Sequence, residues 1–400
     1  MNSINGNTVS YWLVDQVSAA SGVPSTPVFT NIRRVGGSIG RNPSFTQSNE
    51  VDPTRQGAAS ILTQFEVSGT LDGEVIIGDP SFRSRVESVM QNTWSGDVGI
   101  SASTISFDNA SSEIRDSANG FSSLSAGQFI GVFNSGSQTE EVFYITSKTD
   151  NGTLVVNPAP VDESAGATVD IKADFITNDK IEKGLTIQER IPARDGSVRY
   201  NTYEGCQSTS MAFSVSASSI LTITDNIIGL NKLDQSTAVA GQTDEAIDTS
   251  RILGAVNGVP SVFVDGVKED AHTKCYSDIS ITIDNGGSGF YCVGGAGAGG
   301  IQYGAIDVTG SFTSLVDGTD KDTIATEQDK ADNETLFGFS VVFKDADGNY
   351  LVIDRPYTQY DSFSYDGFEN GNLLQNSGTV RSNGKGALGY TVSMTYIEKP

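Results

Sequence analysis

The stretch Phe65-Glu-Val-Ser-Gly-Thr-Leu-Asp-Gly-Glu-Val-Ile-Ile77 alternates apolar and polar residues. Its odd-numbered positions carry apolar residues or Gly, whereas the even-numbered positions from Glu66 to Glu74 carry acidic or hydroxyl side chains. A period of two gives a β-strand one apolar and one polar face. The stretch therefore predicts a half-buried strand, or a hairpin if the chain turns at Asp72-Gly73.

The same period of two recurs along the chain. It is found in residues 211–224, 279–283, 339–353 and 388–396. Alternation in this many segments predicts a mainly β protein with antiparallel sheets, arranged as β-sandwich or barrel domains. One amphipathic helix is expected as well, with Asp79 as its cap and Pro80 in its first turn. Its apolar stripe consists of Phe82, Val86, Val89, Met90 and Trp94.

Composition limits the function. The chain has 400 residues, with 49 acidic and 25 basic side chains, one histidine and a formal net charge of −24. A sequence-reading DNA-binding protein needs a basic face, so the charge argues against that class and against docking on anionic membranes. The single His272 excludes sites that need two histidines, such as those of zinc hydrolases. A Ser-His-Asp enzyme would depend on this one residue.

The cysteines, the N-terminal residues and the lengths of the apolar runs indicate which covalent links and targeting segments to expect. Cys206, Cys275 and Cys292 are odd in number and lack CxxC spacing, so we expect free thiols rather than a disulfide framework or a metal knuckle. The N-terminal residues lack a basic region followed by an apolar stretch, so we expect no secretion signal. No apolar run reaches about 18 residues, so we expect no membrane span.

The two halves of the chain contain short matches in the same order, which indicates an internal duplication. The matching segments are Val67–Leu71 with Val308–Phe312, 80–94 with 320–332, Leu185–Ile191 with Leu336–Phe343, and Phe213–Ser216 with Tyr390–Ser393. We expect a first β domain over 1–99 and 173–230, and a second over 258–400. Residues 231–257 are polar and acidic and predict a linker or loop.

Residues 100–172 predict a small inserted β domain. Short apolar runs alternate there with Ser- and Asn-rich turns, and the strand pattern of the main body resumes only at Leu185. Asn151-Gly152 lies between the runs at Tyr144-Ile145 and Leu154-Val155, and this dipeptide favours a tight hairpin turn.

Three motifs resemble chemical sites without meeting their requirements. Gly295–Gly300 fits G-x-G-x-x-G, but a strand-like segment follows it where a dinucleotide site needs a helix. Asp345–Asn349 begins like a calcium loop, yet a hairpin turn explains it equally well, because Gly is misplaced and Pro356 stands where Glu is needed. His272 and Cys275 lack the surroundings of an activated nucleophile. We therefore expect no catalytic residue, cofactor or metal.

Basic residues gather in one early segment. Arg33, Arg34, Arg41 and Arg55 lie among Gly, Pro, Asn and Ser residues that predict loops. An Arg-rich loop on an acidic protein favours contact between subunits, because charge complementarity selects partner and register. These four residues are the candidates for inter-subunit contact, and scattered surface arginines remain the alternative.

Residues 32–94 resemble the tail tube (major tail) proteins of long-tailed bacteriophages, in which an Arg-containing loop precedes a VxGxL strand and an amphipathic helix ending in Trp. Here the strand motif is Val67–Leu71 and the Trp is Trp94. Residues 183–229, with Tyr203-Glu-Gly205, and the end from 338 to 398 are similar to later strands of that family. The resemblance implies tube-like β domains, and it implies that 100–172 lies on the tube exterior.

The resemblance further implies a virion protein that is assembled in the host cytoplasm. It would oligomerise into stacked rings around a lumen that genomic DNA passes without specific binding. Partners would be further copies, as trimers of duplicated chains or as hexamers, together with the tape measure, terminator and tail tip proteins. Segment 33–55, segment 230–260 and the C-terminal end are candidates for contact between rings. Two other classes remain open. One is a β-sandwich binding module, such as an adhesin, glycan-binding or virion decoration protein, and the other is a hydrolase that uses His272 or a pair of carboxylates in a cleft.

Overall fold

The computed structural model describes most of the chain, and its regular structure is almost entirely β. The described residues are 9–48, 59–217, 219–235, 237–247, 252–253, 259, 261–269, 274–316, 321–366, 375–384 and 386–400. Named strands within these ranges pair antiparallel, except β17 (Thr243–Asp244), which runs parallel to β2 (Val28–Ile32). The prediction of a mainly β, antiparallel protein is confirmed.

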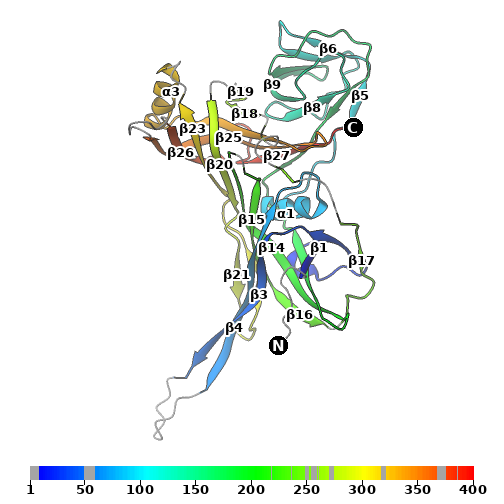
Figure 1. Cartoon of the computed structure of the whole chain (residues 1–400), viewed down its shortest axis with the longest axis vertical. Coiled ribbons are helices and arrows are strands. Elements are labelled where there is room, and N and C mark those ends of the chain that lie inside the picture. Colours follow the sequence, from blue (N-terminus) through cyan, green and yellow to red (C-terminus); the bar gives the residue numbers. More distant parts are fainter. Residues whose placement is uncertain are drawn as a thin grey trace.

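Eight strands form one continuous antiparallel sheet, hereafter the wall. From edge to edge it contains β3 (Gly36–Gln47), β4 (Ser60–Glu74), β15 (Thr222–Gly229), β14 (Val198–Ser216), β20 (Lys274–Asp284), β23 (Asp307–Val316), β26 (Gln375–Ser382) and β25 (Tyr350–Asp366). Figure 1 shows β3 and β4 continuing beyond the body as a projecting hairpin. The chain does not turn at Asp72-Gly73, because both residues pair with β15.

Two smaller sheets cover one face of the wall, and each shares a long strand with it. The first contains β2, β1 (Ser10–Gln16), β13 (Gly184–Pro192), the start of β14 and β16 (Asn231–Gln235). The second contains β19 (Val267–Lys268), β18 (Ser261–Val264), β24 (Phe337–Lys344), the start of β25, β27 (Ser393–Ile397) and β12 (Asp174–Thr177). Strands β16 and β17 lie within 231–257, and a short 3-10 helix, η2 (Ala19–Ser21), follows β1.

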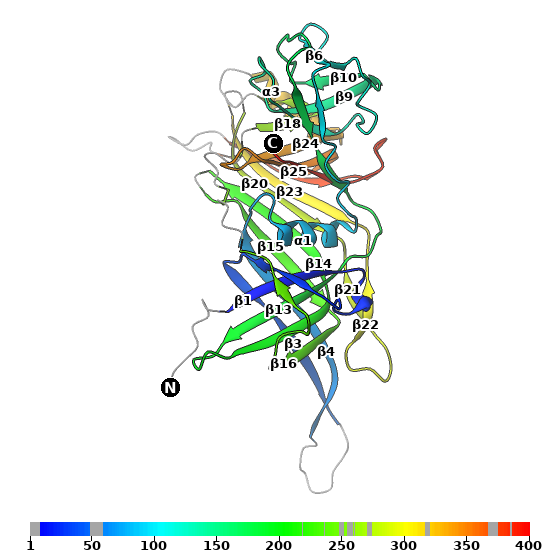
Figure 2. The same cartoon turned by 90° about the vertical axis from the view of Figure 1, so that its right-hand side faces the viewer.

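Helix α1 (Pro80–Met90) lies across the covered face of the wall, as Figure 2 shows. The Asp79 carboxylate accepts a hydrogen bond from the backbone N–H of Ser81, which caps the first turn. Phe82 meets Phe213 of β14 edge to face at 6.2 Å between ring centroids. The predicted helix and its cap are therefore confirmed, and Phe82, Val86, Val89 and Met90 of the predicted stripe are buried. The helix ends at Met90, so Trp94 lies beyond it and is half-buried.

The first and second halves of the wall and its cover share one pairing diagram. In the first half the paired strands are β3–β4, β4–β15, β15–β14, β14–β13, β14–β16, β13–β1 and β1–β2. In the second half the corresponding pairs, in the same order, are β20–β23, β23–β26, β26–β25, β25–β24, β25–β27, β24–β18 and β18–β19. A bulge interrupts β14 between Ser208 and Ser210, and another interrupts β25 between Tyr360 and Ser362. Helix α3 (Lys321–Asp332) follows β23 as α1 follows β4.

The sequence matches agree with this diagram in all but one place. Val67–Leu71 and Val308–Phe312 occupy β4 and β23, and the next match joins β13 to β24. The match of Phe213–Ser216 with Tyr390–Ser393 does not follow the diagram. Phe213–Ser216 ends β14, whose counterpart is β25, whereas Ser393 begins β27, the counterpart of β16.

A separate seven-stranded sheet lies within residues 100–172. Its order is β5 (Ile100–Ala102), β11 (Val169–Lys172), β8 (Phe129–Phe133), β9 (Val142–Asp150), β10 (Thr153–Asn157), β7 (Glu113–Asp116) and β6 (Ile105–Asp108). It has its own apolar core, with Phe121, Phe143 and Leu154 fully buried. The predicted hairpin at Asn151-Gly152 is confirmed, because these two residues join β9 to β10.

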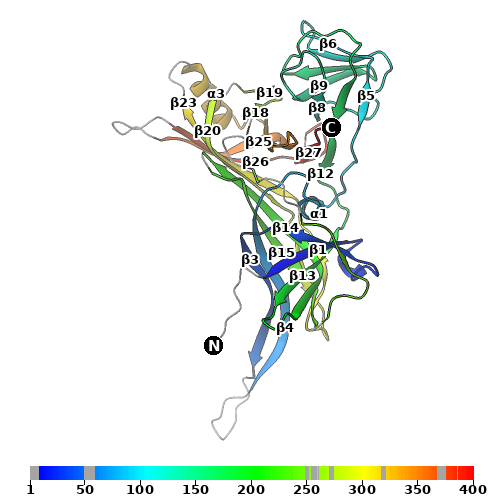
Figure 3. The same cartoon turned by 45° about the vertical axis from the view of Figure 1, so that its right-hand side comes forward.

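Alternate side chains of β24 and β25 point to opposite sides of the covering sheet, and their contacts show the order of the layers. Val341 and Leu351 face the core beneath the wall, whereas their neighbours Val342 and Val352 pack with Phe129 of the small sheet. The sequence of layers is therefore wall, core, covering sheet and small sheet. Figure 3 shows the small sheet on the same side of the wall as α1.

Candidate assembly surfaces and channel-lining face

The face of the wall opposite α1 carries hydroxyl, amide and carboxylate side chains. Residues of the other parity, such as Val67, Phe213 and Ile281, are buried against the covering layer. Acidic side chains described on the polar face include Glu66, Asp72, Glu74, Asp278, Asp284 and Asp307. Among the side chains described on this face, Arg381 is the one cation, and its Nε lies 3.7 Å from Asp307 and 3.3 Å from Asp361. The polar face is therefore acidic overall.

Side-chain hydrogen bonds join neighbouring strands across the polar face. The bonded pairs are Asn42–Ser68 at 3.0 Å, Thr224–Asp72 at 3.0 Å, Asn226–Ser210 at 2.7 Å, Ser280–Ser311 at 2.7 Å, Thr313–Ser377 at 3.3 Å and Ser362–Thr379 at 2.7 Å. Because these short side chains bond to one another, they contribute to cross-strand stability and fix the register.

Two buried carboxylates lie behind the wall and away from the polar face. Asp225 of β15 has Arg85 of α1 at 3.7 Å and accepts a hydrogen bond from Ser208 at 3.0 Å. Asp354 of β25 accepts one from Ser340 at 2.6 Å. Burial raises the pKa of each carboxyl to about 7, against the opposing effect of these partners. Both groups are sealed in the core, so they act on stability rather than on a substrate.

Two hairpin arms extend from the same end of the wall. The first is the outer part of β3 and β4, and the second consists of β21 (Ser288–Tyr291) and β22 (Ala298–Gln302), inserted between β20 and β23. The backbone N–H of Phe65 donates to the Ala296 carbonyl at 2.7 Å and joins the arms. The arms carry the exposed apolar side chains Phe45, Ile61, Leu62, Phe290 and Val293. Exposed apolar clusters of this kind mark contact surfaces.

The four candidate arginines have different places. Arg34 donates to the Gly37 and Val9 carbonyls at 3.0 and 3.1 Å, so it ties the N-terminal segment to β3. Arg33 lies next to it and lines a shallow cleft together with Glu74. Arg41 is exposed on the first arm, with its guanidinium 3.8 Å from the centroid of the Phe65 ring. Arg55 lies outside the described residues.

The expectation that this Arg-containing segment is a loop is wrong for residues 36–47. They form β3, whose backbone pairs with β4 along its whole length. Sequence reasoning also missed the exposed apolar side chains Phe45, Ile61 and Leu62. Residues 61–65 read Ile-Leu-Thr-Gln-Phe and do not alternate, so no local pattern marks these side chains as exposed.

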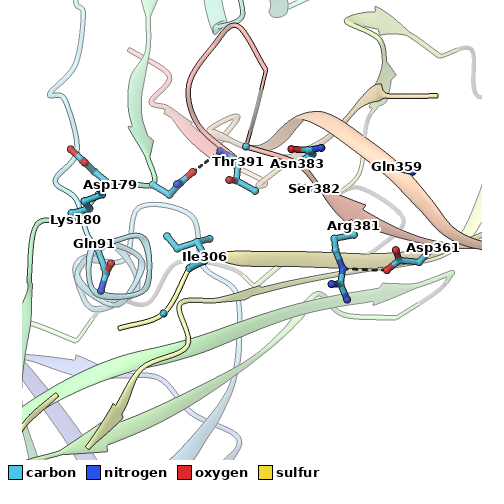
Figure 4. A pocket seen from close by; sticks show the side chains of 14 residues that line it. Gln91, Asp179, Lys180, Ile306, Gln359, Asp361, Arg381, Ser382, Asn383 and Thr391 are labelled. Atoms are coloured by element: carbon cyan, nitrogen blue, oxygen red, sulfur yellow. Dashed lines mark hydrogen bonds and ion pairs between the residues drawn. The ribbon is translucent and has the colours of Figure 1, made fainter. Parts of the chain in front are cut away.

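A polar cleft of about 530 Å³ opens where α1, the segment 178–180 and β25–β26 meet (Figure 4). Asn178 accepts a hydrogen bond from the backbone N–H of Thr391 at 2.8 Å. Gln91, Lys180 and Arg381 also line the cleft. Figure 4 shows the Arg381–Asp361 ion pair at the cleft margin, so this cation is already neutralised.

The chemical motifs have structural explanations where they are described. Both carboxylate oxygens of Asp345 accept hydrogen bonds within the turn between β24 and β25, including one from Asn349 N–H at 2.8 Å. Residues 295–300 span the tip of the second arm and the start of β22, and strand β23 follows them. Cys206 is a buried thiol, and Cys275 and Cys292 are exposed thiols. His272 lies outside the described residues.

A family profile described as "Phage tail tube protein" matches residues 6–395, nearly the whole chain. The chain belongs to the phage tail tube protein family. The resemblance inferred from residues 32–94 is thereby confirmed. No curated protein matches the chain.

Family membership makes this chain a structural component of a phage tail. It also implies association with further copies and with other tail proteins. Among the described residues, the structure contains no helix with the length and apolarity needed to span a bilayer.

Proposed function

We propose that copies of this chain assemble into rings, and that the rings stack into a hollow tail tube through which the genome leaves the particle. The observation that carries this proposal is the wall, a twisted antiparallel sheet with one covered apolar face and one uncovered polar face. Such sheets close into cylinders when copies join at their edges, which removes exposed strand edges. In a closed ring the polar face lines the lumen.

The charge of the polar face suits a passage for DNA. Proteins hold DNA by releasing counterions from phosphates, which requires Lys and Arg side chains. The acidic residues of the polar face repel phosphates instead, so DNA slides past without specific binding. This role requires no reaction, and we propose that the chain is not an enzyme.

The repeated pairing diagram supports a duplicated chain and a ring of three copies. Three chains would supply six similar wall units, whereas six chains would supply twelve. The same diagram supports a first β domain over 1–99 and 173–230 and a second over 258–400, except that β16 (Asn231–Gln235) belongs to the first half of the diagram and extends the proposed first domain to Gln235. The layer order supports an exterior position for 100–172, because the small sheet and the polar face lie on opposite sides of the wall.

Contact between rings is assigned to the two arms. They project from one end of the wall, and their exposed apolar side chains become buried when they reach the next ring. Burying a Phe or Leu side chain contributes roughly 1.5–3 kcal/mol.

Electron microscopy of the purified protein tests this proposal. We expect rings or tubes with threefold symmetry, six similar wall units and small sheets on the outside. A protein that stays monomeric at high concentration and binds glycans on an array would contradict the tube and support the binding-module alternative. Threefold particles with a closed centre would contradict the conduit.

A further inference from the structure

The wall has two edges at which the described part of the chain places no further strand. At one edge β3 pairs with β4, and at the other the C-terminal half of β25, including residues 362–364, pairs with β26. Long edges without a neighbouring strand are templates for pairing with another strand. On β3 the Ile39 carbonyl already accepts a hydrogen bond from the Tyr203 hydroxyl at 2.7 Å, and its second lone pair leaves room for a further bond. Because the two edges lie on opposite sides of one sheet, a second copy of the chain can join each of them.

The middle of the wall contains a junction of the same kind. There the C-terminal half of β14 pairs antiparallel with β20, from Ser210 opposite Asp284 to Ser216 opposite Asp278. In the shared pairing diagram, β25 is the counterpart of β14 and β3 is the counterpart of β20. The two open edges are therefore the counterparts of the two strands that already meet inside the chain.

Two features align the counterparts residue by residue. Ile39 lies opposite Gly69 of β4, and Ile281 lies opposite Gly310 of β23, in the matching segments Val67–Leu71 and Val308–Phe312. This aligns β3 with β20. The bulge that follows Ser208 in β14 and the bulge that follows Tyr360 in β25 align the other two strands.

We propose that β25 of one copy pairs antiparallel with β3 of the next copy in the register of the β14–β20 junction. The opposed residues are Ser362 with Asn42, Phe363 with Arg41, Ser364 with Gly40, and Tyr365 with Ile39. This seam rests on the proposed ring and specifies how the ring closes.

Side-chain chemistry supports this register. Inside the chain, Met211 and Phe213 oppose Ile283 and Ile281 on the covered face, while their neighbours on the polar face are small or polar. At the seam, Phe363 and Tyr365 take the covered positions, and Ser362 and Ser364 take the polar positions opposite Asn42 and Gly40. A slip of one residue would exchange the two faces, which makes the register specific.

Arg41 within the seam and Pro43 next to it fit this register as well. The Arg41 guanidinium already lies on the Phe65 ring, and the opposed Phe363 offers a second aromatic face. Pro43 follows Asn42 directly, and proline cannot donate a ladder hydrogen bond. The seam therefore ends where the β14–β20 junction ends, at the counterparts of Ser210 and Asp284.

Cysteine cross-linking of assembled protein tests the seam. In a background with Cys275 and Cys292 replaced by Ser, Ser364→Cys and Gly40→Cys are combined in one chain. A side chain fits at Gly40, because an added Cβ would meet nothing nearer than 3.7 Å. Mild oxidation should link most chains into species of up to three copies on a non-reducing gel. The shifted combination Ser362→Cys with Gly40→Cys should link at least five-fold less.

Matched internal pairs show whether each position accepts a disulfide. The counterpart of the first pair is Ala212→Cys with Thr282→Cys, which should close within one chain. Because neighbouring cross-strand pairs differ in hydrogen bonding, Phe363→Cys with Arg41→Cys, matched by Met211→Cys with Ile283→Cys, covers the alternative geometry.

The outcomes separate the seam from the ring. Linkage at the opposed pairs supports the register. Linkage mainly at the shifted pair in intact rings overturns the register and leaves the ring standing. Intact rings with linked internal pairs but no linkage between chains overturn strand pairing at the seam. Failure of the unsubstituted protein to form rings overturns the proposed function and the seam together.

Discussion

The two halves of the wall share a backbone pairing diagram, yet they place different side chains at equivalent buried positions. Tyr203 of β14 donates a hydrogen bond to the Ile39 carbonyl at 2.7 Å, whereas the buried Arg355 occupies the equivalent position of β25. Asp225 of β15 is replaced in β26 by Gly378. Register and bulges are therefore the shared features, and each half has its own solution for the core.

The largest effect is expected where both halves need glycine. An Ala Cβ at Gly69 would lie 2.1 Å from the Ser38 carbonyl oxygen, and one at Gly310 would lie 2.8 Å from the Ser280 carbonyl oxygen and 2.4 Å from the guanidinium of the buried Arg355. We expect each of Gly69→Ala and Gly310→Ala to lower the free energy of unfolding by about 3 kcal/mol or more. Urea denaturation of the purified subunit measures both. Gly40→Ala is the control, at about 0.5 kcal/mol or less; equal losses in all three variants would refute a shared close approach.

A second prediction compares two equivalent residues, one buried at the β14–β20 junction within the chain and the other at the proposed seam between chains. Phe213 is 2% exposed and packs on Phe82, so Phe213→Ala should cost about 3–5 kcal/mol of subunit stability. Its counterpart Tyr365 is partly exposed. Tyr365→Ala should cost the subunit about 1 kcal/mol, while ring formation should require at least ten-fold more protein. Calorimetry and sedimentation measure the two effects, with Leu336→Ala as the exposed control. A Tyr365→Ala variant that assembles like the unsubstituted protein would count against the seam.

The two buried carboxyl groups make the stability of the subunit depend on pH, and each half of the wall supplies one of them. The pKa of Asp225 and of Asp354 is raised to about 7, above the unfolded value near 3.9. The stability that each protonated carboxyl contributes is therefore fully present below about pH 4, and it is lost as the pH rises through about 7.

Asp354→Asn removes one of these two titrations. The unsubstituted subunit should lose about 1–4 kcal/mol more stability than this variant between about pH 4 and pH 7.5. Urea denaturation at several pH values measures the difference. Asp347→Asn, at an exposed turn residue, should follow the unsubstituted curve. Parallel curves for Asp354→Asn and the unsubstituted subunit would show that this carboxyl titrates normally.

Patterned burial made much of the fold predictable. The alternation around Val67, the capped stripe of α1, the Asn151-Gly152 hairpin and the turn at Asp345–Asn349 follow from local physical rules, and the structure contains each of them. The sequence match of Val67–Leu71 with Val308–Phe312 identifies equivalent strands, because a neighbouring backbone approaches closely at the central glycine of each segment.

Edge strands and arms were not predictable in the same way. Strand β3 has Ile39 as its single buried residue, so its sequence shows no alternation, and its pairing depends on backbone groups that every residue carries. The candidate Arg34 contacts its own chain, whereas the contact surfaces inferred from the structure are strand edges and apolar arm residues. Which edges remain open depends on long-range pairing, which a local pattern does not encode.

The smallest effect on stability is expected at the polar face, where the halves are alike. Glu66 and Asp307 each precede the shared glycine by three residues and lie on the same face. Glu66→Lys combined with Asp307→Lys should change subunit stability by less than about 1 kcal/mol, because the sites are exposed and such charges are screened. The assembled tubes should nevertheless retain short duplex DNA at low salt and release it as salt is raised.

Co-sedimentation of the tubes with labelled DNA measures this retention. Glu334→Lys with Glu398→Lys makes the same change in net charge outside the wall. If this control pair retained DNA equally well, net charge rather than a lumenal position would explain the binding.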